Sequence, residues 1–299
     1  MRYGIQVAPL GDYADARRLA ALAGDAEAAG WDGFFIWDAV VPHWTTPLLD
    51  PTVALTAIAL HTARLRFGIM VTPLPRRRPW KYARETASLD RLSGGRLVVG
   101  VGTGEGPGEW ENLGDEPSPQ RRGEMLDEGL DVLTGLWSAS AGEPFSYAGA
   151  HYTVREAHFI PPPVQRPRIP IWVGGQWPNR KPARRAARWD GYFPIDRDHF
   201  AFDRMMSVEL MAEAVAFVRR QRQALGRGDA PFDFIHAGIT PGGDPAADAA
   251  IVAPYAEAGV TWWLEQVTPW VFGWSEEDEG PWPVERMRAR VLAGPPALA

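Results

Sequence analysis

The stretch Arg-Leu-Val-Val-Gly-Val-Gly-Thr-Gly-Glu-Gly, residues 96–106, is the part of the chain on which the fold prediction depends. Its first half is a short, apolar, β-branched run, which is typical of a strand buried on both faces in a parallel sheet. Its second half carries glycine at every other position, and glycine exposes backbone N–H groups to an approaching ligand. A glycine-rich turn at the carboxyl end of a parallel strand predicts a phosphate cradle, although a plain strand exit fits the same residues.

The composition indicates a soluble, cytoplasmic protein whose partners are neither nucleic acid nor membranes. The 31 Lys and Arg and the 37 Asp and Glu residues are spread without blocks along 299 residues, and their difference gives a net charge of −6. The absence of Cys excludes disulfides and thiolate metal sites. No segment approaches the roughly 18 apolar residues of a membrane span, and a signal peptide is not expected. The 14 Trp residues suit a pocket for a planar ligand, and a Trp-rich core explains them equally well.

Strand and helix patterns alternate along the whole chain, without a hairpin between successive strands. Strands are predicted at 2–8, 33–37, 65–71, within 96–106, and at 169–173, 191–195, 232–239 and 261–267. Each is followed by a helical pattern, and this alternation requires parallel strands joined by crossover helices. We therefore predict a single α/β domain, a (β/α)8 TIM barrel over residues 1–299. An insertion at 139–168, between the fourth helix and the fifth strand, contains a predicted hairpin; an open doubly wound sheet is the alternative fold.

In such a barrel the ligand site lies at the carboxyl ends of the strands. Glycine turns are predicted after the fourth and fifth strands, at Gly102–Gly104 and Gly174–Gly175, and together they could hold one phosphate from two sides. Five tryptophans are expected at the same mouth: Trp37, Trp44, Trp110, Trp177 and Trp270. A phosphate cradle beside aromatic walls favours a phosphorylated planar cofactor.

Five separated segments, in order along the chain, resemble the bacterial luciferase-like family of flavin-dependent monooxygenases and reductases. They are Ala29–Asp38 (AGWDGFFIWD), Leu89–Gly104 (LDRLSGGRLVVGVGTG), Arg122–Trp137, Pro163–Gly175 (PVQRPRIPIWVGG) and Ala186–Gly191 (AARWDG). The resemblance implies a barrel that binds FMN, or the deazaflavin coenzyme F420, at its mouth. By the same resemblance, the phosphate and ribityl chain would be held by Gly102, Thr103, Gly104, Gly174, Gly175 and Gln176. The strand end near Thr72 would lie against the isoalloxazine ring, often through a non-proline cis peptide.

Three activities follow from the resemblance. The first is a monooxygenase of a small organic substrate, supplied with reduced FMN by a separate flavin reductase. The second is hydride transfer with F420, which the GVGTGE run ending at Glu105 favours. The sugar-phosphate dehydrogenases of that type have His directly after the Asp of the second strand, and here that position is Ala39. The third is a flavin-binding protein without catalysis, and in each case a homodimer or higher homo-oligomer is expected.

His43 and Glu105 are the candidate catalytic residues, because both follow barrel strands and can exchange protons. Asp38, Trp44, Trp110 and Trp177 are the candidate substrate-pocket residues, and Asp38 could instead anchor its own loop. His236 is interpreted as a core histidine, and Glu265 as either a buried pocket carboxylate or a core partner of an arginine. The run Arg76–Arg78 is either solvated or directed at an anionic cofactor tail. No spacing of His, Asp and Glu predicts a metal site.

Overall fold

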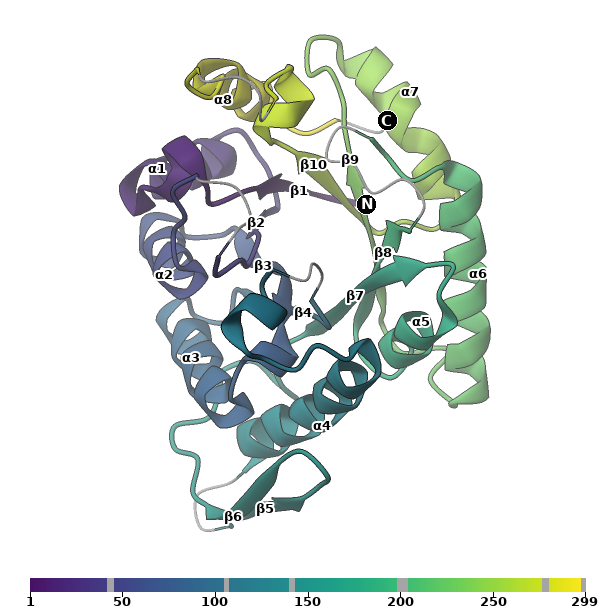
Figure 1. Cartoon of the computed structure of the whole chain (residues 1–299). Coiled ribbons are helices and arrows are strands. Elements are labelled where there is room, and N and C mark those ends of the chain that lie inside the picture. The colour runs from purple at the N-terminus through teal and green to yellow at the C-terminus, as the bar shows by residue number, and fades with distance from the viewer. Residues whose placement is uncertain (42–45, 105–107, 140–142, 198–203, 276–279, 297–299) are drawn as a thin grey trace.

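Eight parallel strands close into a barrel in the computed structural model, which describes residues 1–41, 46–104, 108–139, 143–197, 204–275 and 280–296 (Figure 1). Their order around the barrel is β1-β10-β9-β8-β7-β4-β3-β2. They are β1 (Arg2–Val7), β2 (Gly33–Ile36), β3 (Arg66–Pro73), β4 (Leu97–Gly102), β7 (Ile171–Trp177), β8 (Gly191–Asp196), β9 (Asp233–Gly238) and β10 (Trp262–Gln266). The predicted (β/α)8 barrel is confirmed, and the open sheet is wrong.

Helices surround the barrel on its outer side (Figure 1). They are α1 (Ala16–Ala28), α2 (Pro51–His61), α3 (Pro79–Leu92), α4 (Pro119–Ser138), α5 (Arg180–Ala186), α6 (Val208–Ala224), α7 (Pro245–Glu257) and α8 (Val284–Leu292). Short 3-10 turns occur in the loops: η1 (Gly11–Ala14), η2 (Leu74–Arg76), η3 (Glu111–Leu113) and η4 (Pro269–Phe272). Asp15 and Asp50 begin α1 and α2 by accepting backbone N–H groups of the first turn. Among the described residues, no helix is long and apolar enough to cross a membrane.

The insertion after α4 forms a two-stranded antiparallel hairpin, β5 (Phe145–Ala148) and β6 (Thr153–Ala157), at the outer edge of the molecule (Figure 1). Glu128 of α4 holds the hairpin turn, because its carboxylate accepts the backbone N–H groups of Ala150, His151 and Tyr152 at 2.8, 2.9 and 3.1 Å. The hairpin therefore packs against α4, on the outer side of the barrel.

Side chains that alternate along the strands separate an inner core from an outer one. Phe35, Trp172 and Trp262 meet inside the barrel, with ring centroids 5.3 to 5.8 Å apart. Gly191 admits one of these rings, since a Cβ there would lie 2.4 Å from Trp172 Cδ1. The barrel is thus filled at mid-height, and a ligand can enter only at one of its two openings.

Candidate active site

The end of β3 forms the floor of the carboxyl-terminal mouth. The Met70–Val71 peptide is cis, at the strand end where the family resemblance implied such a bond. The strand register shifts between Ile69 and Thr72, and Val71 packs against the inner cluster of the barrel. A Cβ at Gly102 or Gly174 would lie 2.7 Å from a Val71 methyl group. Both glycines are therefore required for Val71 to fit between β4 and β7.

Thr103 and Gly104 follow β4 and form the predicted cradle. Gly104 has φ +75°, in the left-handed region that favours glycine, and a Cβ there would lie 2.4 Å from Trp110 Cζ2. Within the described part of the chain, neither residue's N–H donates a hydrogen bond to a protein acceptor. Two adjacent free N–H groups beside a left-handed glycine can bind a phosphate oxygen. The turn therefore fits the cofactor that the sequence predicted.

The second predicted glycine turn is wrong, because Gly174 and Gly175 lie inside β7. The strand continues to Trp177 and pairs with β8 along this whole length. Gly175 serves helix packing, since a Cβ there would lie 2.3 Å from Pro182 Cβ in α5. Gln176 follows on the inward side of the strand, by alternation from Trp172, and its amide oxygen lies 3.5 Å from Asn179 Nδ2.

The Thr72 side chain faces away from the mouth. It is fully buried, and its hydroxyl lies 3.1 Å from the hydroxyl of Tyr82 in α3. Burial raises the pKa of Tyr82 to about 12, so the phenol stays neutral and can donate this bond. A ligand at this strand end would meet the backbone and Val71 rather than the threonine hydroxyl.

Asp38 ties three loops together. Its carboxylate, which is not exposed at all, accepts hydrogen bonds from Arg76 and Arg77 at 2.9 and 2.7 Å. Arg76 also binds Glu109 at 2.6 Å, and Glu109 accepts the backbone N–H of Val40 at 2.5 Å. The two acids and two bases are mutually neutralised, so this network anchors the loops after β2, β3 and β4. The alternative of a solvated arginine run is wrong for Arg76 and Arg77.

Two of the tryptophans predicted for the pocket are core residues. Trp110 is 1% exposed, and its ring lies against the guanidinium groups of Arg76 and Arg122 at 6.0 and 4.5 Å. It supports the cradle from below through its contact with Gly104. Trp177 faces outward to α6, with its ring 5.6 Å from Phe217, because it stands on the side of β7 opposite to Trp172. The expectation that Trp177 lines the mouth is therefore corrected.

An aromatic wall does stand at the mouth, and the sequence analysis found only part of it. Trp37, at the end of β2, stacks on Trp270 with centroids 5.8 Å apart and planes 11° apart. Trp274 and Trp282 extend this cluster through ring contacts of 6.0 to 6.2 Å with Trp270. The strand pattern does not predict Trp274 and Trp282, because both follow η4 in the last loop, well beyond the end of β10.

The predicted residues His43, Trp44 and Glu105 lie outside the described residues. His236 is a core histidine, as interpreted, stacked on Tyr255 at 4.2 Å, and burial lowers its pKa to about 3. Glu265 is the core partner of an arginine, the second of the two predicted alternatives. Its carboxylate lies 3.2 Å from the guanidinium group of Arg290, and both side chains are only 1–2% exposed. Burial raises the pKa of Glu265. Among the described residues, no group of His, Asp and Glu is arranged to hold a metal ion.

Comparison with known proteins places this chain among luciferase-like proteins. A family model described as luciferase-like monooxygenase matches residues 3–259. An uncharacterised protein of Mycobacterium tuberculosis is 31% identical over 230 residues, which cover 71% of this chain and 73% of that protein. An F420-dependent glucose-6-phosphate dehydrogenase of Microbacterium testaceum is 34% identical over 157 residues, 51% of this chain and 45% of that protein. A monooxygenase structure from Streptomyces bottropensis superposes with a TM-score of 0.76 and 21% identity, covering 98% of both chains.

Proposed function

The chain belongs to the luciferase-like monooxygenase family, and we propose that it is a flavin-dependent oxidoreductase that oxygenates a small organic substrate with reduced FMN. The observation that carries this proposal is the pair of N–H groups at Thr103 and Gly104, which have no acceptor among the described residues and lie beside the Val71 floor. Backbone donors of this kind suit the phosphate of FMN, and the apolar Val71 side chain suits one face of a flat ring.

When bound, FMN supplies the redox chemistry, and the chain supplies position and exclusion of water. Gly102, Thr103 and Gly104 would hold the phosphate end, with Gly174 and Gln176 bordering it from the inward side of β7. Trp37 and Trp270 would cover the reacting end of the ring. The Asp38 network keeps the surrounding loops in one arrangement, because Asp38 and Glu109 are both paired with arginines of the loop after β3. His43 and Glu105 are the proposed proton-transfer residues. A separate flavin reductase and a homodimeric or higher homo-oligomeric assembly complete the proposal.

Hydride transfer with F420 is the second candidate. It is favoured by the 34% identical segment shared with an F420-dependent dehydrogenase, and by the acid that follows the glycines at Glu105. It is disfavoured by Ala39, because the related dehydrogenases are expected to have a histidine there. A flavin-binding protein without turnover is the third candidate.

The test is a titration of the purified protein with FMN and with F420, each oxidised and reduced, followed by single turnover in the presence of oxygen. We expect tighter binding of reduced FMN and oxygen consumption coupled to substrate. Tight binding of F420 alone would replace the first candidate by the second, and binding without turnover would support the third. Failure to bind either cofactor contradicts the whole proposal.

Gly104→Val is the variant that tests the cradle. The branched side chain would resist positive φ and would meet Trp110, so the turn should lose its donors and flavin affinity should fall at least about tenfold. Gly226→Val is the matched control, because Gly226 also has positive φ (+67°) but open space around it. Equal loss of affinity in both variants, or no loss in Gly104→Val, would remove the cradle from the site.

A further inference from the structure

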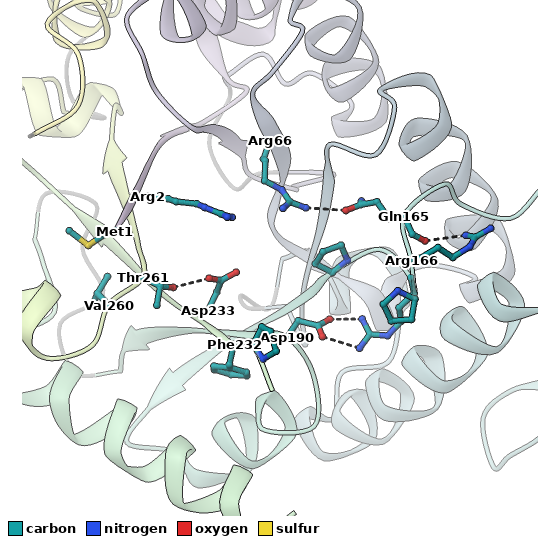
Figure 2. A pocket seen from close by; sticks show the side chains of 14 residues that line it. Met1, Arg2, Arg66, Gln165, Arg166, Asp190, Phe232, Asp233, Val260 and Thr261 are labelled. Atoms are coloured by element: carbon teal, nitrogen blue, oxygen red, sulfur yellow. Dashed lines mark hydrogen bonds and ion pairs between the residues drawn. The ribbon is translucent and has the colours of Figure 1, made fainter. Parts of the chain in front are cut away.

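A second cavity, of about 620 Å³, lies at the opposite opening of the barrel, where the strands begin (Figure 2). Arg2, Arg66 and Asp233 are the first residues of β1, β3 and β9, and all three line it. We propose that this amino-terminal basin binds a small, hydroxylated oxyanion: a polycarboxylate or phosphate ester that carries at least one hydroxyl group. A volume of this size lies within the range of small-molecule sites, roughly 300–1,000 Å³.

The basin is positively charged, although the chain as a whole is negative. Its lining contains four arginines, Arg2, Arg66, Arg166 and Arg168, and two carboxylates, Asp190 and Asp233. Arg168 and Asp190 form a bidentate ion pair and neutralise each other. Arg166 donates to the carbonyl oxygens of Pro163 and Gln165 at 2.7 and 3.1 Å, so its hydrogen-bonding capacity is partly used. The groups left for a ligand are Arg2 and Arg66.

Arg2 and Arg66 both point into the basin, and Asp233 lies across from them (Figure 2). Within the described residues, no carboxylate oxygen lies within 4.0 Å of either guanidinium group. Arg66 donates to the neutral amide of Gln165 at 3.0 Å, and its buried Nε has no hydrogen-bond partner. Arg2 lies over the ring of Trp262, at 5.5 Å from the centroid.

Two like charges that share a cavity oppose each other unless an anion lies between them. Burial, followed by the nearby charge of Arg2, lowers the pKa of Arg66, and the opposing charges of Asp233 and Asp90 offset this only in part. The unpartnered Nε of Arg66 is buried, so the terminal nitrogens are the part of its guanidinium group that a ligand would meet. A carboxylate or phosphate supplies the missing counter-charge, because guanidinium groups bind these ions with charge-assisted hydrogen bonds.

Asp233 determines which oxyanion fits. Its carboxylate accepts the hydroxyl of Thr261 at 2.9 Å, and its side chain lies at the basin (Figure 2), where a carboxylate can accept further hydrogen bonds. A purely anionic ligand would be repelled there, whereas a hydroxyl group on the ligand would donate to it. The basin therefore favours an anion that presents charge to Arg2 and Arg66 and a hydroxyl to Asp233.

Citrate and tricarballylate are suitable probes, because they share three carboxylates and differ only in one hydroxyl group. Calorimetric titration of the full chain, without flavin, should show citrate binding at least about tenfold tighter than tricarballylate. Arg66→Gln and Arg2→Gln should each weaken citrate binding by about tenfold or more. Arg2 is an exposed first strand residue, so Arg2→Gln tests the site even where Arg66→Gln fails to fold.

Arg18→Gln is the matched control, since it removes the same charge from an exposed side chain at the start of α1, beside the other opening. Citrate affinity in this variant should equal that of the wild type. Equal weakening in all three variants, or no binding of citrate at millimolar concentration, overturns the proposal. Equal binding of citrate and tricarballylate overturns the part assigned to Asp233.

Discussion

At the carboxyl-terminal mouth, Asp38 and Glu109 neutralise the guanidinium groups of Arg76 and Arg77, whereas at the amino-terminal basin Arg2 and Arg66 have no carboxylate partner among the described residues. At the mouth, charged side chains build the frame, and the binding groups are the backbone N–H donors of the cradle. At the basin, the side chains themselves are left to bind. Residue type alone therefore does not identify a site, because what matters is whether the partner of a charge belongs to the protein.

The largest effect is expected where charges are paired inside the protein. Asp38→Asn keeps the shape but leaves Arg77 and part of Arg76 without a counter-charge, so the free energy of unfolding should fall by about 3–5 kcal/mol. Arg2→Gln, at the other opening, should change it by less than about 0.5 kcal/mol. Chemical denaturation of both variants measures the difference. Similar values for the two would contradict the contrast between the openings.

A smaller effect on the free energy of unfolding is expected at Gly174, where the backbone of β7 packs closely against Val71. Gly174→Ala places a methyl group against Val71 and should reduce the free energy of unfolding by about 1–3 kcal/mol, with weaker flavin binding. Val71→Ala in the same chain should restore part of the loss, because the added methyl then has room. Gly243→Ala is the control, since a Cβ there meets nothing within 4 Å. The absence of coupling between the two positions would show that Val71 is not the floor.

The barrel could be predicted from the sequence because strand and helix periodicities are local properties. Helix caps are equally local: Asp50 accepts backbone N–H groups at the start of α2, and Pro51 is the first residue of that helix. Gly174 and Gly175 were interpreted as a turn, but their neighbours are Val71 and Pro182, which belong to other elements. The two glycines therefore correctly indicated that another group approaches the backbone closely. That group is a side chain of the protein at each position, rather than the predicted phosphate.

The side chains of the site were less predictable, because their partners are distant in the sequence. Asp38 binds residues that lie 38 and 39 positions further along the chain, and no periodicity reveals such pairs. The prediction places Trp177 at the mouth because the predicted strand ends at residue 173, four residues before the end of β7. The basin did carry a signal: Arg2, Arg66 and Asp233 are the charged residues of their strands, each at the first position and with inward register.

The smallest effect on the free energy of unfolding is expected for Asp233→Asn. It tests whether the negative charge of Asp233 already compensates the positive charges of Arg2 and Arg66. Burial raises the pKa of this carboxyl group in the folded state, although Arg2 and Arg66 lie nearby. A raised folded-state pKa means that the native protein binds more protons than the unfolded chain, so stability falls as pH rises through this range. Asp233→Asn should remove that slope and leave the variant up to about 1 kcal/mol more stable than the wild type at pH 7, but not at pH 3. Denaturation across pH 3 to 8 tests this. A variant that is instead less stable at pH 7 would mean that the ionised Asp233 already compensates the two arginines, and the basin would then need no anion from outside.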